Sequence, residues 1–263
     1  MENLKKEYEN FGFFKLENVF DKIFIKKTID EINSCKELAC VKIFNKENER
    51  IIRNNVDVYY DKKGSLRRME RLYDKGEALK STNKKILNLL KEIFNYEFTI
   101  FKDKYNAKPS GGEGFFAHYD GIFKFKNEND EYKKGWYEYG DFFVNALIAL
   151  VPSDVDNGTI EIANAQKGSF DELLSNTKKN GTPNLLPEIE KKLKFKVINL
   201  NIGDVIIFSN TCPHRSKKNN SNVDRKILYY TYTPLKYGSM YEKYFIDKSK
   251  SKNTNSGSLS GEL

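Results

Sequence analysis

One stretch of the chain, residues 142–151 with the sequence FFVNALIALV, strongly limits how the chain can fold. Both alternating faces of this stretch are apolar, which is typical of a strand that is covered on both sides. The stretch is far too short to cross a bilayer as a helix. The sequence therefore predicts a central strand with a layer of structure on each side. Asn145 interrupts its apolar pattern, and we expect this side chain to face a pocket.

The segments around this strand predict helices first and strands afterwards. Helical spacing of apolar residues predicts helices at 2–10, 21–34 and about 82–94. Asp21 is a candidate N-cap for the second helix, and Ser81 or Thr82 for the third. Strand patterns occur at 12–16, 98–106, 159–162, 195–200, 204–208 and 226–233. Residues 41–80 are charged and aromatic, and could form strands and loops over the mouth of a barrel. This order predicts an α+β, mainly β protein whose catalytic half is a β-barrel or sandwich.

Length favours one domain, because 263 residues can bury one substantial core. We expect this domain to cover residues 1–246. A polar insertion at about 166–193 is expected to carry one helical piece. Residues 247–263 are polar and are expected to be a disordered tail.

The composition excludes several classes of protein. The 45 basic and 37 acidic residues are spread along the chain, and the lysine-rich blocks lack a repeated arginine and aromatic pattern. We therefore interpret them as a solvated surface and expect no nucleic-acid partner. Three cysteines without a C-x-x-C pair indicate neither a disulfide framework nor a zinc ribbon. The N-terminus lacks the apolar core of a signal peptide, so we expect a cytoplasmic protein without a membrane partner.

The two histidines of the chain both lie in segments suited to metal binding. His118 and Asp120 are two residues apart, and residues i and i+2 of a strand point to the same face. His214 follows the strand at 204–208 and a turn. Two imidazoles and one carboxylate hold non-haem iron(II) with open coordination positions. Arg225 lies eleven residues after His214, and its planar guanidinium can pair with a dicarboxylate. A 2-oxoglutarate-dependent oxygenase requires this combination.

With these motifs the sequence resembles the phytanoyl-CoA dioxygenase-like (PhyH) branch of the iron(II)/2-oxoglutarate oxygenases over most of residues 5–235. The resemblance rests on Gly12-Phe13-Phe14, His118-Tyr119-Asp120, the segment 156–162, Gly203-Asp204, and His214, Ser216, Asn219, Ser221 and Arg225. It implies a double-stranded β-helix, a jelly-roll or cupin-like barrel, with N-terminal helices packed on one sheet. It also implies His118, Asp120 and His214 as the catalytic Fe(II) ligands, and Arg225 and Ser216 as residues that bind 2-oxoglutarate. The implied reaction consumes O2, converts 2-oxoglutarate to succinate and CO2, and is supported by ascorbate in vitro.

The sequence departs from the family pattern at a few positions. Tyr119 stands where the family often has glutamine, and residues 163–166 replace a usual Pro-Gly-Ser-His. Neither departure removes an implied ligand. Asp120 is intact where halogenating relatives have glycine or alanine, which favours hydroxylation. Arg215 could compete with Arg225 for the co-substrate, but the spacing favours Arg225.

Other candidate binding residues lie on the strand that precedes the metal motif. Lys102, Lys104 and Asn106 share one face of it. If this face looks into the barrel, we expect Lys104, together with Asn145, to contact 2-oxoglutarate. Lys102 and Asn106 would then contact an anionic substrate, and a solvated lysine pair is the alternative. Trp136 is a candidate substrate contact, although a packed aromatic loop fits the sequence equally well.

Within the family, residues 101–109 and the glycine-rich segment after them look most like small-molecule hydroxylases. Hydroxylases of aminophosphonates such as 2-aminoethylphosphonate are examples, and basic residues ahead of the iron suit a phosphonate. A free amino acid, a betaine-like osmolyte or an acyl thioester remains open. One alternative is an oxygenase of a carrier-bound or acyl-CoA substrate, with the insertion as a docking surface rather than a lid. Another is a catalytically silent ligand-binding barrel. Stereochemistry and oligomeric state stay open.

Overall fold

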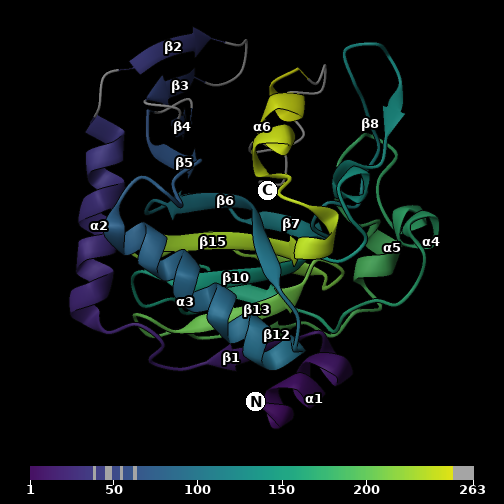
Figure 1. The fold of residues 1–263 in the computed structure, drawn as a ribbon, viewed down its shortest axis with the longest axis horizontal. Coiled ribbons are helices and arrows are strands. Elements are labelled where there is room, and N and C mark those ends of the chain that lie inside the picture. The colour runs from purple at the N-terminus through teal and green to yellow at the C-terminus, as the bar shows by residue number, and fades with distance from the viewer. Residues whose placement is uncertain (38–39, 45–48, 54–55, 62–63, 251–263) are drawn as a thin grey trace.

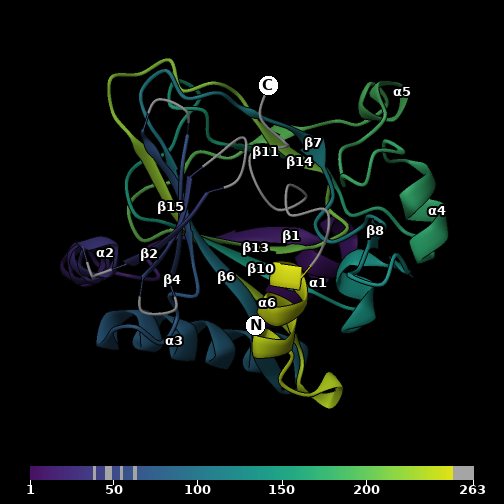
Figure 2. The same ribbon diagram turned by 90° about the horizontal axis from the view of Figure 1, so that it is seen from above.

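The computed structural model describes residues 1–263 except 38–39, 45–48, 54–55, 62–63 and 251–263. Two antiparallel sheets face each other and form a double-stranded β-helix. In Figure 1 the central strands of the larger sheet lie side by side. Over the described residues, the larger sheet has the strand order β1-β13-β10-β15-β6-β5-β4-β3-β2, and the smaller has the order β12-β11-β14-β7. Figure 2 shows β7, β11 and β14 on one side of the barrel and β1, β13 and β10 on the other. The predicted fold class is confirmed.

The bounds of the elements are as follows. The larger sheet contains β1 (Phe13–Leu16), β2 (Cys40–Phe44), β3 (Glu49–Arg53), β4 (Val56–Tyr60), β5 (Leu66–Glu70), β6 (Phe98–Lys108), β10 (Val144–Ala149), β13 (Val205–Ser209) and β15 (Arg225–Pro234). The smaller sheet contains β7 (Phe115–His118), β11 (Ile160–Ile162), β12 (Lys196–Val197) and β14 (His214–Ser216). A separate hairpin pairs β8 (Phe125–Lys126) with β9 (Tyr132–Lys133). The helices are α1 (Glu2–Phe11), α2 (Lys22–Glu37), α3 (Glu77–Phe94), α4 (Phe170–Ser175), α5 (Pro187–Glu190) and α6 (Tyr241–Lys250), with short 3-10 turns η1 (Gly135–Glu138) and η2 (Leu235–Tyr237). In the described part of the chain, no helix has the length and apolarity that a membrane span needs.

The central strand β10 is covered on both sides, as its apolar pattern predicts, and all six of its residues are buried. Val144, Ala146 and Ile148 face outward and share a core with apolar residues of α1, α2 and α3. Leu147 and Ala149 face inward and pack with residues of the smaller sheet. Each such buried aliphatic side chain contributes about 1.5–3 kcal/mol relative to an exposed one. The inner face is therefore apolar at this end of β10, and Asn145 is the polar position at the other end.

The third helix begins earlier than its sequence signals indicate. It starts at Glu77, so the prediction of Ser81 or Thr82 as its N-cap is wrong. The Glu31 carboxylate of α2 instead accepts hydrogen bonds from the backbone N–H groups of Ala78 (2.9 Å) and Leu79 (3.0 Å). A carboxylate at a helix N-terminus satisfies unpaired N–H groups and matches the helix dipole. Because this cap comes from another helix, local sequence could not reveal it.

Three further segments differ in detail from the sequence predictions. Residues 41–80 supply β2 to β5, which extend the larger sheet beyond β6. The insertion at 166–193 carries two short helices, α4 and α5, instead of one. The expected disordered tail from residue 247 is wrong for residues 247–250, which belong to α6, and its remainder lies outside the described residues. Asp21 caps α2 as predicted, because its carboxylate accepts a 2.8 Å hydrogen bond from the first turn.

A buried carboxylate on β6 ties the C-terminal helix to the sheet. Asp103 accepts hydrogen bonds from the backbone N–H groups of Arg71 (3.1 Å), Leu72 and Tyr73 (2.9 Å), and from the Tyr241 hydroxyl of α6 (2.7 Å). Arg71 has a left-handed backbone with φ of 67°. Four donors on one buried acceptor therefore fix both the turn after β5 and the start of α6.

Candidate active site

Strand pairing brings the two histidines together. His118 ends β7 and His214 begins β14, and their Cα atoms are partners in the register of these two strands. The ring centroids lie 4.2 Å apart. Asp120 lies in the loop beyond β7, where its backbone N–H donates to the Asn210 carbonyl (3.0 Å) and the Asn210 amide donates to its carbonyl (3.2 Å). One ligand atom from each of His118, Asp120 and His214 lies within 4.8 Å of the other two.

Both imidazoles are oriented by backbone carbonyls. The Nδ1 atom of His118 lies 2.7 Å from the Phe116 carbonyl, and that of His214 lies 3.1 Å from the Cys212 carbonyl. Each Nδ1 therefore carries the proton in the neutral ring, and each Nε2 is left as a lone-pair donor. Burial, helped by the neighbouring His214, lowers the pKa of His118 to about 3, and burial also lowers the pKa of His214. Neutral imidazoles are the form that binds metal.

The Asp120 carboxylate is held by a side chain of the larger sheet. Burial alone would raise the pKa of Asp120, but His214, Lys104 and His118 outweigh it and hold that pKa below its usual range. The Asn145 amide donates to Asp120 Oδ2 (2.9 Å), and the Thr231 hydroxyl donates to Asn145 Oδ1 (2.7 Å). Asn145 faces the site as expected. Its observed contact is with Asp120, so it positions that carboxylate rather than standing free for 2-oxoglutarate.

Arg225 begins β15 with its side chain on the inner face of the sheet. It is 2% exposed, and one Nη donates to the Gly158 carbonyl. Among the described residues, its buried Nε has no hydrogen-bond partner. Burial, with a smaller contribution from Arg67, lowers the pKa of Arg225 to about 10. A buried guanidinium with an unused N–H donor is suited to bind a carboxylate.

Lys108 is a buried residue of this region that the sequence analysis missed. It is 1% exposed, and it lies opposite Arg225 in the strand register. Its ammonium donates to the Ser216 hydroxyl (2.8 Å), the Gly158 carbonyl (3.2 Å) and the Lys217 carbonyl. Lys108 therefore fixes Ser216 and shares the Gly158 carbonyl with Arg225. The alternation from Lys102 through Lys104 and Asn106 continues to Lys108, and that signal could have found it.

Arg215, the competing arginine, is already paired near the surface. Its guanidinium donates to Glu161 Oε2 (2.8 Å) and to Glu190 Oε1 (2.7 Å), and its side chain is 33% exposed. These two acids neutralise it outside the barrel. Arg225 is therefore the arginine that faces the site.

The β6 lysines face inward and are not a solvated pair. Lys102 is 9% exposed and its ammonium lies 3.3 Å from the Tyr244 hydroxyl of α6. Lys104 is half-buried, with its ammonium 4.5 Å from the centre of the Tyr229 ring. Burial lowers the pKa of Lys104 to about 8, although Asp120 partly opposes this. Asn106 is also buried on this face.

Trp136 belongs to a packed aromatic cluster. It is 4% exposed, its ring lies 5.4 Å from those of Phe101 and Phe143, and the ammonium of Lys102 lies 5.1 Å from its centre. A Cβ on Gly121 would lie 2.4 Å from the indole, so only glycine allows this approach. Trp136 therefore packs between the aromatic rings and the Lys102 ammonium, and the packed-loop alternative describes it better than a substrate contact.

A further group of polar side chains beside β6 was not predicted. Tyr59 of β4, Arg68 and Glu70 of β5, and Lys248 of α6 are in contact with one another, and Glu70 is 0% exposed. Sequence reasoning missed them because residues 41–80 had no clear pattern and Lys248 fell in the expected tail.

Comparison with known proteins agrees with this geometry. The family model described as phytanoyl-CoA dioxygenase (PhyH) matches residues 8–227. A 2-aminoethylphosphonate dioxygenase of the uncultured bacterium HF130_AEPn_1 is 25% identical over 186 residues, which cover 70% of this chain and 64% of that protein. A methylphosphonate hydroxylase of Gimesia maris is 29% identical over 154 residues, which cover 58% of this chain and 52% of that protein. The chain thus matches less than two thirds of the length of either relative.

Solved structures share the fold at low sequence identity. The non-heme alpha-ketoglutarate-dependent carbocyclase SnoK from nogalamycin biosynthesis has a TM-score of 0.63 at 12% identity, covering 89% of this chain and 84% of SnoK. EctD from S. alaskensis, with 2-oxoglutarate and 5-hydroxyectoine, has a TM-score of 0.62 at 12% identity, covering 90% of this chain and 77% of EctD. These likenesses establish the barrel, and the family match covers most of the sequence. The chain belongs to the phytanoyl-CoA dioxygenase (PhyH) family.

Proposed function

We propose that this protein is an Fe(II)- and 2-oxoglutarate-dependent dioxygenase that hydroxylates a small anionic metabolite, with a phosphonate as the favoured class. The reaction is coupled to decarboxylation of 2-oxoglutarate to succinate and CO2. One observation carries the proposal. Three ligand atoms from His118, Asp120 and His214 lie within 4.8 Å of one another. The inner face of the larger sheet also carries the buried Arg225, whose Nε has no hydrogen-bond partner in the described part of the chain.

The residues present fit the iron and the co-substrate. His118 and His214 would bind Fe(II) through Nε2, because both Nδ1 atoms are engaged, and Asp120 would supply the carboxylate. Arg225, next to the Ser216 hydroxyl that Lys108 holds, would pair with the far carboxylate of 2-oxoglutarate. When bound, the iron and 2-oxoglutarate supply the oxidising chemistry, while the protein positions and shields it.

The anionic substrate class follows from Lys104. Within the described residues, its ammonium has no carboxylate partner within ion-pair distance, although burial already disfavours its charge. A desolvated, unpaired cation beside the iron ligands is stabilised when an anion binds. Two relatives are named for phosphonates, and a phosphonate offers several oxygens to Lys104. An aminophosphonate such as 2-aminoethylphosphonate and an amine-free phosphonate both belong to this class.

The test is aerobic turnover with Fe(II), ascorbate, 2-oxoglutarate and free phosphonates as the only organic additions. We expect substrate-dependent release of succinate and a product heavier by one oxygen atom, and we expect neither from a His118→Ala variant. Turnover only of an acyl-CoA or carrier-bound compound would favour that alternative. A protein that never consumes 2-oxoglutarate with O2 would instead be a silent ligand-binding barrel, and the proposal would be wrong.

A further inference from the structure

A cluster of charged and polar side chains lies on the inner face of β4, β5 and β6, in contact with α6. We call it the charged chamber, and its residues are Asp57, Tyr59, Arg68, Glu70, Lys102, Lys104 and Lys248. In the strand register, Glu70 of β5 is the partner of Lys104 of β6. Paired residues on neighbouring strands have Cβ atoms about 4.5–5.5 Å apart, so Glu70 and Lys104 stand side by side on one face. Lys102 is the register partner of Thr231 of β15, whose hydroxyl donates to Asn145, and the Asn145 amide donates to Asp120. The chamber therefore lies next to the proposed iron ligands.

Glu70 is paired with groups of the protein itself, although its Oε1 has no hydrogen-bond partner among the described residues. Its Oε2 accepts hydrogen bonds from the Tyr59 hydroxyl (3.1 Å) and from the ammonium of Lys248, and its Oε1 lies 3.6 Å from Arg68 Nε. Burial alone would raise the pKa of Glu70, but Arg68, Lys248 and Lys102 outweigh it and hold that pKa far below its usual range. Glu70 is therefore an ionised carboxylate that already has its cations.

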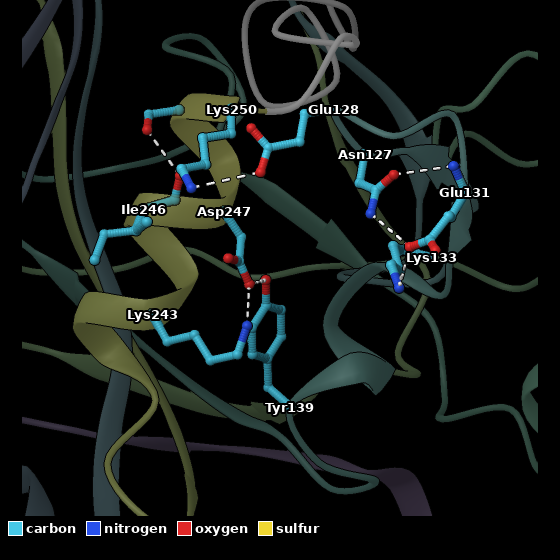
Figure 3. A network of polar contacts seen from close by, with 10 residues as sticks. Asn127, Glu128, Glu131, Lys133, Tyr139, Lys243, Ile246, Asp247 and Lys250 are labelled. Atoms are coloured by element: carbon cyan, nitrogen blue, oxygen red, sulfur yellow. Dashed lines mark hydrogen bonds and ion pairs between the residues drawn. The ribbon is translucent and has the colours of Figure 1, made fainter.

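The helix that brings Lys248 is anchored independently of Glu70. Figure 3 shows the outer contacts of α6. The Tyr139 hydroxyl donates to Asp247 (2.8 Å), and Lys250 forms a 3.5 Å ion pair with Glu128. At its start, the Tyr241 hydroxyl is bonded to the buried Asp103. These contacts place Lys248, whose side chain is 18% exposed, over Glu70 without help from a ligand.

The chamber has more basic than acidic side chains. Its basic residues are Arg68, Lys102, Lys104 and Lys248, and its carboxylates are Glu70 and Asp57, which also has a partner of its own. Burial lowers the pKa of Lys248 to about 7, and the charge of Glu70 opposes this shift. An anion would offset this excess of basic groups, whereas a substrate ammonium would meet several like charges and a Glu70 carboxylate that is already paired with Lys248 and Arg68. Introducing an unpaired ammonium into such a buried site is unfavourable.

We propose that Lys248 determines substrate specificity by occupying Glu70, the carboxylate that an amine-bearing substrate would need. Resting on the proposed function, this inference names the substrate as a compact anion without an amino group. Of the two substrate types for which the relatives are named, the charged chamber favours the amine-free phosphonate. Lys248 acts here as an internal substitute for the substrate's own ammonium.

The test uses two phosphonates that differ only by a terminal amino group, ethylphosphonate and 2-aminoethylphosphonate. Their dissociation constants are measured by calorimetry without O2, with Fe(II) and 2-oxoglutarate bound. We expect the wild type to bind ethylphosphonate at least about tenfold more tightly. Lys248→Met, which frees Glu70, should shift the ratio of the two constants at least about tenfold toward the amine. Lys248→Arg keeps the ion pair and should keep the wild-type ratio.

Lys243→Met is the matched control, because Lys243 lies on the same helix with its side chain 60% exposed and outside the chamber. It should leave the ratio unchanged. Either of two results would overturn this inference and leave the proposed function standing. One is a wild-type preference for 2-aminoethylphosphonate, and the other is an unchanged ratio of the two dissociation constants in Lys248→Met. The wild-type comparison decides the question even if that variant is unstable. Failure of all variants to bind either phosphonate would instead overturn the proposed substrate class, and the inference with it.

Discussion

Replacing Asn145 with leucine tests how the larger sheet holds Asp120, the proposed metal ligand. The Asn145 amide is 1% exposed and donates a 2.9 Å hydrogen bond to the Asp120 carboxylate. A hydrogen bond to a charged group is worth about 1.5–3 kcal/mol. Loss of a group that orients a metal ligand typically costs about 10–100-fold in metal affinity, which is the same range of free energy. Leucine keeps the volume but cannot donate, so we expect Asn145→Leu to bind Fe(II) about 10–100-fold more weakly.

The assay is an anaerobic titration of the apo protein with Fe(II), which reports metal affinity without turnover. Thr231→Val is the matched control, because it removes the 2.7 Å bond to Asn145 but leaves the amide that donates to Asp120. We expect its loss of affinity to be less than about tenfold. Thermal unfolding of both apo variants separates a damaged fold from a damaged site. If folded Asn145→Leu bound Fe(II) within about threefold of the wild type, the hydrogen bond would not position Asp120 and the reasoning would be refuted.

Three further predictions follow from the buried charges. Arg225→Lys should raise the KM for 2-oxoglutarate about 10–100-fold with little change in kcat at saturation, because a lysine cannot form the planar fork of a guanidinium. The control is Arg215→Lys, at an arginine paired near the surface, and it should leave steady-state kinetics unchanged. Burial lowers the pKa of Lys104 to about 8, so its ammonium is lost as pH rises through that value. We therefore expect kcat/KM for the phosphonate to fall about tenfold per pH unit above about 8. A Lys104→Arg variant whose pH profile fell in the same way would contradict this assignment. Asp103→Ala leaves four hydrogen-bond donors without their acceptor. It should lower the free energy of unfolding, measured by urea denaturation, by about 3 kcal/mol or more. A loss below about 1 kcal/mol would show that water replaces the carboxylate.

Local patterns in the sequence were sufficient for most of the fold. The apolar run at 142–151 predicted a strand covered on both sides, and β10 is such a strand. Helical periodicity located α2 and α3, but the start of α3 was misplaced because its cap, Glu31, comes from a neighbouring helix. Periodicity reports which face of an element is buried, and it carries no information about which distant side chain will meet its end.

Motif spacing predicted the three residues that the fold brings together, because the chemistry of an iron site restricts the choice of ligands. The chain has two histidines, so any site with two imidazoles must use His118 and His214. Spacing alone also favoured Arg225 over Arg215, and the structure turns the first inward and pairs the second with acids outside the barrel.

The tertiary structure alone decided how these groups are supported and what surrounds them. The contacts of Asn145 with Asp120 and of Lys108 with Ser216 depend on which strands are neighbours and in what register, which no local pattern encodes. Lys248 reaches Glu70 only because α6 packs back onto the sheet. Composition, spacing and periodicity are local properties of a chain, whereas the charge balance of a buried site is a sum over residues that only the fold brings together.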